Sequence, residues 1–429
     1  MESIINLYKT QGDAEYFGEN VSKTTHMIQT AMAAQQNNEP DYLVLACLLH
    51  DIGHFLDTDN MNGLGVIEHG KIGADYLRQL NMSECVCLLV ENHVMAKKYL
   101  VSKNDDYYQK LSPASKQTLE YQGGRMSASE MEEMEKHPNF NNILQVRHYD
   151  DIGKQVGMDI PTIDSFIPLI NKYLLTPETI EYSRKLKENG FLLLKDYFSI
   201  NESQQIIDFK QQLENLEETK GKWMIYYEKN NQRSRIENFI NYSPNIKLFI
   251  ENKISPLIEN ICQTPMILFK DKLNWKLSQG DGFEPHQDHP AWNDFTISRF
   301  YSIALFANNS TIENGCLQVV SGKNNIGEIN SNGCIPAEIA DKYQWEYLET
   351  TPRDLLIFDS FIPHKSDKNT TDKSRSIFYF TYNKLEEGDH YQKYITHKRK
   401  YFPPPIERDN LEIKIEIENN KYNLGNPIN

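Results

Sequence analysis

The N-terminal part of the chain carries apolar runs of a helical type rather than the strict alternation of an exposed strand. Residues 41–50 are almost continuously apolar and contain Leu and Ala, which favours a buried helix. Comparable helical candidates follow at residues 85–93, 139–149 and 163–175. We therefore predict an all-α helical bundle and assign it to residues 1–175.

The pattern changes near residue 176, where Thr176-Pro177-Glu178 predicts a helix start. Short segments rich in β-branched and aromatic residues follow, bounded by Gly, Asn, Asp and Pro, as is typical of strands. The strand candidates are residues 222–228, 268–277, 300–306, 317–320, 355–358 and 375–382. Many short strands without regular intervening helices predict a double-stranded β-helix, or jelly roll, with flanking helices over residues 176–429.

Composition and charge narrow the class of protein. The 429 residues are 39% apolar and 11% aromatic, which is enough for ordinary cores and excludes wholesale disorder. The chain has 45 basic and 60 acidic residues, a net charge of −15 that repels nucleic acid and anionic membranes. It shows no spanning apolar run, no secretory signal and no disulfide framework among its six cysteines. We expect a cytoplasmic protein that acts on a small molecule, and the sequence does not indicate its oligomeric state.

Histidines and aspartates collect in the helical part. His50 and Asp51 end the first apolar run, and at a helix terminus both side chains can converge on a metal. One histidine on an apolar helix is usually a core residue, but an ordered set of six favours a metal site. Imidazole and carboxylate suit zinc, iron or manganese, and two metals need a shared bridging carboxylate. The candidate ligands are His26, His50, Asp51, His69, His93 and either Asp150 or Asp151.

In this order the ligands resemble the HD-domain superfamily, H…HD…H…H…D, whose members are mostly phosphohydrolases. Other motifs resemble the HD-domain di-iron oxygenases that cleave the carbon–phosphorus bond of 1-hydroxyphosphonates. These motifs are Tyr16-x-x-Glu19, His50-Asp-Ile-Gly-His54, Lys97, Gln122-Gly-Gly-Arg-Met-Ser127 and Arg147-His-Tyr-Asp-Asp151. The resemblance covers residues 8–172 and implies a mixed-valent pair of irons, with Asp51 as the bridge and Asp150 as the last ligand.

The same resemblance assigns roles beside the metals. It implies that His54, Lys97, Ser127 and Arg147 hold the phosphonate, and fixed cations are what a dianion needs in an otherwise acidic domain. Tyr16, Glu19 and His54 would be the catalytic groups. Tyr16 would act as a gate whose phenol covers an iron until the substrate arrives. In the alternative, Tyr16 is a packing residue that fixes the helix carrying His26.

A second set of ligands lies in the β-rich part. His286 and Asp288 are two residues apart, so an extended strand would turn both side chains to one face. His364 follows a predicted strand and turn, and Arg375 opens the next strand. Two histidines and a carboxylate form the facial triad of non-haem Fe(II) oxygenases. An arginine near the distal histidine can clamp the far carboxylate of 2-oxoglutarate.

This part resembles the phytanoyl-CoA dioxygenase family of Fe(II)/2-oxoglutarate oxygenases over residues 189–401. Supporting matches are Asn314-Gly-Cys-Leu317, Ser321-Gly322 and Thr381-Tyr-Asn383. The resemblance is to the branch that hydroxylates small zwitterions, including 2-aminoethylphosphonate. Lys272, Asn274 and Lys276 alternate on one strand and could bind 2-oxoglutarate or the phosphonate, or form a solvated face. Trp292 could stack against an alkylammonium group.

Together the two resemblances imply consecutive reactions. The C-terminal domain would hydroxylate C1 of 2-aminoethylphosphonate, or of an N-methylated analogue, using O2 and 2-oxoglutarate. The N-terminal domain would then use O2 to cleave the C–P bond, yielding phosphate and glycine or betaine. One alternative is an HD-domain metal-dependent phosphohydrolase fused to an unrelated small-molecule 2-oxoglutarate hydroxylase. Another is that one domain has only a regulatory or scaffolding role.

Overall fold

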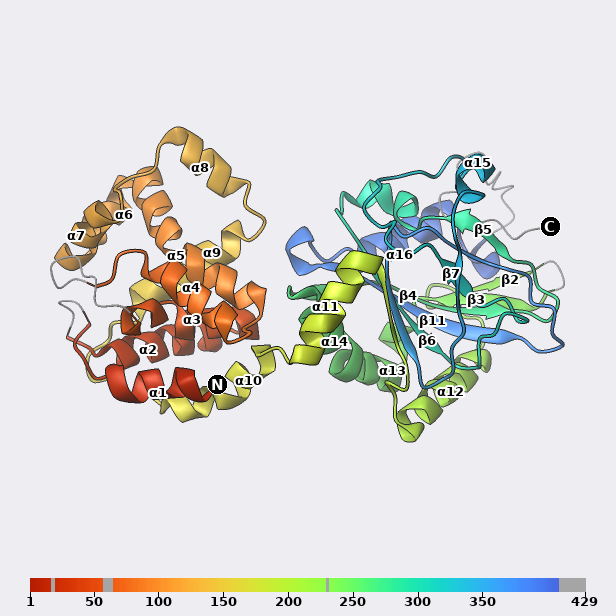
Figure 1. The fold of residues 1–429 in the computed structure, drawn as a ribbon, viewed down its shortest axis with the longest axis horizontal. Helices are drawn as coiled ribbons and strands as arrows, with labels where there is room; N and C mark the ends of the chain where they lie inside the picture. The colour runs from red at the N-terminus through yellow and green to blue at the C-terminus, as the bar shows by residue number, and fades with distance from the viewer. Residues whose placement is uncertain (17–19, 57–64, 229–230, 409–429) are drawn as a thin grey trace. The chain divides into compact units, whose positions relative to one another are not determined.

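A computed structural model describes residues 1–16, 20–56, 65–228 and 231–408. Glu19, one of the predicted catalytic residues, lies outside these ranges. The chain divides into two compact units, Met1–Thr179 and Ile180–Asn429, and the division falls in the first turn of α11 (Pro177–Asn189). The first unit is helical and the second contains the sheets (Figure 1). This order confirms the predicted fold class.

Helix α3 (Asp41–Leu49) forms the centre of the N-terminal unit. Every residue from Tyr42 to Leu49 is buried, because helices α2, α5, α9 and α10 all contact α3. A helix enclosed in this way needs no polar face, which explains the continuous apolar run. The other helices of this unit are α1 (Glu2–Gln11), α2 (Lys23–Gln36), α4 (His69–Gln79), α5 (Glu84–Lys103), α6 (Asp105–Lys110), α7 (Pro113–Tyr121), α8 (Ala128–Glu135), α9 (Phe140–Ile152) and α10 (Ile167–Tyr173).

The C-terminal unit contains two antiparallel sheets. The larger sheet has the strand order β1-β9-β6-β11-β4-β3-β2, and the smaller has the order β5-β10-β7-β8. All six strand candidates overlap observed strands. The strands are β1 (Phe191–Leu194), β2 (Met224–Tyr227), β3 (Arg233–Glu237), β4 (Met266–Lys276), β5 (Phe283–His286), β6 (Tyr301–Phe306), β7 (Leu317–Val319), β8 (Glu346–Leu348), β9 (Leu355–Asp359), β10 (His364–Ser366) and β11 (Arg375–Lys384). The helices after α11 are α12 (Ile200–Glu214), α13 (Pro244–Phe249), α14 (Ser255–Cys262), α15 (Ala337–Ala340) and α16 (Tyr391–Tyr401).

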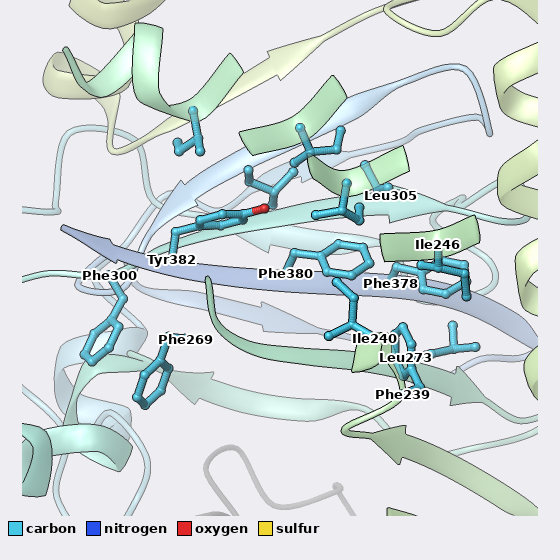
Figure 2. Close-up of a cluster of buried hydrophobic side chains, with 14 of the residues drawn as sticks. Phe239, Ile240, Ile246, Phe269, Leu273, Phe300, Leu305, Phe378, Phe380 and Tyr382 are labelled. Atoms are coloured by element: carbon cyan, nitrogen blue, oxygen red, sulfur yellow. The ribbon is translucent and has the colours of Figure 1, made fainter. Parts of the chain in front are cut away.

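The two faces of strands β4 and β11 have different surroundings. Phe378, Phe380 and Tyr382 alternate along β11 and point into the main hydrophobic core, together with Phe269 and Leu273 of β4 (Figure 2). Because side chains alternate along a strand, the residues between them face the other way. That opposite face lines a cavity of about 570 Å³. The core therefore supports one face of the sheet and leaves the other for a site.

Within the described ranges, no helix combines the length and the apolar composition of a membrane span. The longest described helix, α5, has 20 residues but includes Glu91, Lys97 and Lys98. The six cysteines all carry free thiols.

Candidate functional sites

The six predicted ligands of the N-terminal unit meet in one buried cluster. His26 comes from α2, His50 caps the end of α3, and His69 begins α4. His93 lies in α5 and Asp150 in α9. All six residues, including Asp51, are at most 4% exposed. Polar groups buried this deeply need partners, so their hydrogen bonds indicate what the cluster can hold.

Backbone hydrogen bonds fix the tautomer of the four clustered histidines. Each Nδ1 lies 2.7–3.1 Å from a main-chain carbonyl, which can only accept. Each Nδ1 therefore carries the proton, and each Nε2 presents a lone pair to the cluster. The carbonyls belong to Gly153 for His26, Cys47 for His50, Val66 for His69 and Val90 for His93.

The lone pairs converge as two sets around Asp51. The Nε2 atoms of His26 and His50 lie 3.2 Å apart, and those of His69 and His93 lie 3.0 Å apart. Asp51 Oδ2 is 3.3 Å from His50 and 3.7 Å from His26. Its Oδ1 is 3.2 Å from His69 and 3.4 Å from His93. One carboxylate oxygen thus faces each pair, as a carboxylate that bridges two metals requires.

Asp150 completes this cluster, whereas Asp151 does not enter it. Asp150 Oδ1 lies 3.3 Å from His26 Nε2. Asp150 Oδ1 and Asp51 Oδ2 are buried and have no hydrogen-bond partner among the described residues. Asp151 instead accepts from Arg147 and from the hydroxyl of Tyr107. Opposed lone pairs and unsatisfied carboxylate oxygens fit a pair of metal ions, because cations satisfy both.

His54 differs from the four histidines of the cluster in its tautomer. Its Nδ1 accepts the backbone N–H of Val66 at 3.0 Å, so its Nε2 carries the proton. Burial lowers the pKa of His54 well below its usual value, which keeps the ring neutral. Its Nε2 lies 3.8 Å from Asp51 Oδ1. His54 can therefore donate a hydrogen bond to an anion beside the metals, but it cannot ligate them through Nε2.

A cavity of about 50 Å³ adjoins the metal cluster. Lys97 lines it and donates to Thr118 Oγ1 at 2.6 Å and to Gln122 Oε1 at 3.1 Å. Burial, followed by the charge of Arg147, lowers the pKa of Lys97 to about 7. Ser115 also lines the cavity and was not singled out in the sequence. It lies three residues before Thr118 on α7, so both share a helix face, and no motif recognised in the sequence includes either residue.

Arg147 lines the same cavity but is largely engaged within the protein. Its Nη1 donates to Asp150 Oδ2 at 2.6 Å, and its Nε donates to the Tyr107 hydroxyl at 2.9 Å. Its Nη2 donates to Asp151. The guanidinium therefore orients Asp150, and any phosphonate contact would have to share these donors.

Ser127, which the sequence predicts to bind the phosphonate, caps a helix in this structure and stays a prediction as a contact. Ser127 caps α8, where its hydroxyl donates to Glu130 Oε2 at 2.7 Å and accepts the Glu130 N–H at 3.3 Å. This reciprocal capping box uses the hydroxyl, and Ser127 is not among the residues that line the cavity. Local helix capping therefore accounts for the hydrogen bonds of Ser127 in this structure.

Tyr16 lies directly on the metal cluster. Its ring stacks on His26 with centroids 4.0 Å apart and an interplanar angle of 22°. Burial, followed by the carboxylates of Asp51 and Asp150, raises the pKa of the phenol well above its usual value. The phenol is therefore protonated and stands next to the cluster. This position is compatible with both the gate and the packing role.

The three predicted ligands of the C-terminal unit also converge. His286 ends β5 and His364 begins β10, and the two residues are direct partners across the strand pair. Their Nδ1 atoms donate to the carbonyls of Glu284 and Ile362, so both Nε2 atoms present lone pairs. Each Nε2 lies 3.9 Å from Asp288 Oδ1. The three residues fit a facial set of metal ligands.

The prediction that His286 and Asp288 lie on one face of an extended strand is wrong. Asp288 does not share a strand face with His286, because β5 ends at His286 and Asp288 has φ −74° and ψ −35°. Asp288 instead precedes the 3₁₀ segment His289–Phe295. The turn, rather than the alternation of a strand, brings its carboxylate to the histidines.

Arg375 and Lys276 occupy one end of the C-terminal cavity. They are direct partners on β11 and β4. Arg375 donates to the carbonyls of Asn314 and Gly315 at 3.3 and 3.0 Å. Lys276 donates to Ser366 Oγ at 2.7 Å and to the carbonyl of Asp367. The carbonyls of the Asn314-Gly315 motif therefore orient the cationic side chains at this end of the cavity.

Lysines further along β4 face aromatic rings. The Lys272 ammonium lies 4.8 Å from the ring centroid of Tyr379. Lys270, which sequence reasoning missed, places its ammonium 4.1 Å from the ring centroid of Trp292. The ring of Trp292 thus contacts a protein ammonium. Lys270 continues the alternation of Lys272 and Lys276, and that pattern could have revealed it.

The jelly roll with its His–Asp–His triad defines the C-terminal unit as an oxygenase domain. The family model of phytanoyl-CoA dioxygenase matches residues 186–377, and that of the HD domain matches residues 20–120. The chain belongs to the phytanoyl-CoA dioxygenase family through its C-terminal part and carries an HD domain in its N-terminal part, as the sequence predicted. The first match includes the triad and Arg375, whereas the second ends before Asp150.

Named relatives of the chain include three phosphonate oxygenases. The chain is 37% identical over 258 residues to the 2-aminoethylphosphonate dioxygenase of Uncultured bacterium HF130_AEPn_1, covering 58% of this chain and 98% of the relative. It is 38% identical over 175 residues to the [1-hydroxy-2-(trimethylamino)ethyl]phosphonate dioxygenase (glycine-betaine-forming) of Leisingera caerulea, covering 40% and 89%. It is 33% identical over 168 residues to the hydroxymethylphosphonate dioxygenase of Gimesia maris, covering 38% and 83%. The protein is thus an oxygenase that joins an HD domain to a phytanoyl-CoA dioxygenase domain.

Proposed function

We propose that this protein degrades phosphonates oxidatively through two consecutive reactions, one in each domain. The C-terminal domain hydroxylates C1 of 2-aminoethylphosphonate or of its N-methylated analogue. The N-terminal domain then cleaves the C–P bond of the 1-hydroxy product. The observation that supports this most is the presence, in one chain, of two buried ligand clusters together with relatives named for both kinds of substrate.

The two reactions balance and share an intermediate. In the first, one oxygen atom of O2 enters the C1–H bond, and the other enters succinate as 2-oxoglutarate loses CO2. In the second, the C–P and C1–H bonds of the hydroxylated compound break. The two oxygen atoms of O2 complete phosphate and the carboxylate of glycine or betaine. When bound, one iron at the triad and a mixed-valent pair at the HD cluster would supply the activation of O2.

The residues of the C-terminal domain position the cosubstrate. His286, Asp288 and His364 would hold the iron, and Arg375 would clamp the far carboxylate of 2-oxoglutarate. The carbonyls of Asn314 and Gly315 hold two guanidinium nitrogens and so pre-orient Arg375. Lys276 lies beside it and adds positive charge to this end of the cavity.

The residues of the N-terminal domain position the hydroxylated phosphonate. His26, His50, Asp51, His69, His93 and Asp150 would hold the irons. His54 Nε2–H and the ammonium of Lys97 would donate to phosphonate oxygens, with Ser115 replacing the predicted Ser127. Tyr16 would cover the cluster until this substrate displaces it.

Phosphate release from 2-aminoethylphosphonate by the iron-loaded full chain tests this function. We expect release to require both 2-oxoglutarate and O2, and release from the supplied 1-hydroxy compound to require O2 alone. The His286→Ala variant should lose only the first reaction, because the two ligand clusters share no residue. Phosphate release without O2 would contradict the proposal and indicate a phosphohydrolase.

A further inference from the structure

The C-terminal cavity is positively charged although the chain as a whole is acidic. Eight lysine and arginine side chains line it, against four carboxylates. One of those carboxylates, Asp288, belongs to the metal triad, whereas the whole chain has a net charge of −15. Such a concentration of cations favours anionic ligands. Binding of 2-oxoglutarate would place one dianion in the cavity. The remaining cations favour a second anionic ligand.

The cations lie in two groups on the cavity face of β4. Lys276 stands at one end, opposite Arg375, where it is bound by Ser366 and Asp367. Lys270 stands six residues away, about 20 Å along an extended strand. A five-carbon diacid clamped by Arg375 cannot reach that far. Lys270 is therefore separate from the proposed 2-oxoglutarate clamp. Lys272 lies between the two, on the ring of Tyr379, whose side chain also interacts with Arg375.

Lys270 is buried without an anionic partner. The residue is 8% exposed, and its ammonium lies 4.1 and 5.8 Å from the ring centroids of Trp292 and Tyr394. Within the described parts of the chain it makes no hydrogen bond or ion pair. Among the described residues, the Lys272 ammonium contacts the ring of Tyr379 and makes no hydrogen bond or ion pair. Burial lowers the pKa of both ammonium groups, and at Lys272 the charge of Lys270 adds to this effect.

Two carboxylates act on these lysines, and both are engaged elsewhere: Asp288 belongs to the metal triad, and Glu237 binds other donors. Glu237 faces Lys272 across the β3–β4 pair, but it accepts from the hydroxyl of Tyr394 at 2.8 Å. It also lies 3.5 Å from the ammonium of Lys398 and 3.6 Å from Arg235. The charge of Glu237 is therefore shared among other donors. Lys270 and Lys272 can then bind an anionic ligand.

The position of this lysine pair suits a group next to the reacting carbon. Lys270 and Lys272 line the same cavity as His286, Asp288 and His364. Trp292, which contacts Lys270, follows Asp288 by four residues in the adjoining 3₁₀ segment. A phosphonate is attached directly to the carbon that would be hydroxylated, so it must bind beside the triad.

We propose that Lys270 and Lys272 form the subsite that binds the phosphonate of the C-terminal domain's substrate, and that Lys270 selects a dianion over a monoanion. This inference rests on the proposed function. Two ammonium groups against aromatic walls match the two charges of a phosphonate, whereas a sulfonate carries only one. Desolvated cations without an internal anion form stronger interactions with such a ligand than solvated ones do.

The Lys270→Met variant tests the subsite, because Met keeps the length of the side chain and removes the charge. We expect the KM for 2-aminoethylphosphonate to rise about 30-fold, the loss of one charge-assisted contact. The KM for 2-oxoglutarate and the decarboxylation without substrate should stay unchanged. Preference for the phosphonate over 2-aminoethanesulfonate should fall. Lys393→Met is the matched control, since Lys393 also contacts a ring, that of Phe295, but lies outside the cavity.

Stability separates this role from a structural one. Removal of a buried, unpaired ammonium should raise the melting temperature, whereas a lysine that supports the fold would lower it. Unchanged KM for the phosphonate, or a lowered melting temperature with proportional losses for both cosubstrates, would overturn the proposal.

A binding measurement keeps the subsite distinct from the proposed function. Inorganic phosphate is titrated into the iron-free full chain, wild type and Lys270→Met, and binding is measured by calorimetry. Weaker binding to the variant supports the subsite even if wild type does not turn over 2-aminoethylphosphonate, in which case only the proposed function fails. Equal binding to both proteins would refute the subsite.

Discussion

His26 and Asp150 face each other across 3.3 Å, with the lone pair of Nε2 directed at a carboxylate oxygen that has no hydrogen-bond partner in the described ranges. Two such groups repel unless a cation lies with them. We expect Asp150→Ala to lower the metal content of the HD domain. Asp151→Ala should retain it, because Asp151 bonds Arg147 and Tyr107 instead. Elemental analysis of both folded variants checks this, and the reverse result would exclude Asp150 as a ligand.

The stacking of Tyr16 on His26 permits a direct test of the gate. Tyr16→Phe removes only the hydroxyl, so a packing residue should lose about 1 kcal/mol of unfolding free energy and little else. A gate should change the iron spectrum without substrate and speed oxidative inactivation of the resting enzyme. Native spectra and native turnover in the variant would assign Tyr16 a purely structural role.

Ser115 and Ser127 are alternative candidates for the serine that binds the phosphonate in the N-terminal domain. Ser115→Ala should raise the KM for the 1-hydroxyphosphonate, because Ser115 lines the cavity beside Lys97. Ser127→Ala should leave this KM unchanged and destabilise the domain by about 1 kcal/mol through loss of the α8 cap. Steady-state kinetics and thermal unfolding of the pair distinguish them. A raised KM in the Ser127 variant alone would restore the motif-based assignment.

Lys97 should make phosphonate cleavage sensitive to pH. Its lowered pKa of about 7 means that the ammonium is present below that pH and is lost above it. From about pH 7 to about pH 9 the phosphonate is a dianion, so its KM should rise as Lys97 is deprotonated. Lys97→Arg keeps its charge over this range and should flatten the profile. A flat profile in the wild type would show that Lys97 does not bind the substrate as a cation.

Arg375 should determine the affinity for 2-oxoglutarate. Arg375→Lys retains the charge but loses the planar pair of donors, so the KM for 2-oxoglutarate should rise about tenfold or more. The KM for 2-aminoethylphosphonate should change less, because Arg375 pairs with Lys276 at the end of β4, six residues from Lys270. Succinate formation at varied 2-oxoglutarate measures this. An unchanged KM would move the clamp to Lys276.

Much of the architecture follows from local patterns. The apolar run at residues 41–50 predicted a buried helix, and α3 is enclosed on all sides. Strand periodicity located β4 and β11, since half-buried strands alternate between a core face and an open face. The strand β3 (Arg233–Glu237) was missed, because it carries charged side chains, two of which, Arg235 and Glu237, line the cavity.

The sequence by itself determined which chemical groups the two sites contain and in what order, because ligand type and spacing are local properties. The tertiary structure alone decided how they combine. Backbone carbonyls from Gly153 and Cys47 set the lone pairs of His26 and His50, and one oxygen of Asp51 faces each histidine pair. His54 became a donor only through the N–H of Val66. Such choices depend on which distant segments pack together, and the free energy of that packing is not contained in any single stretch of sequence.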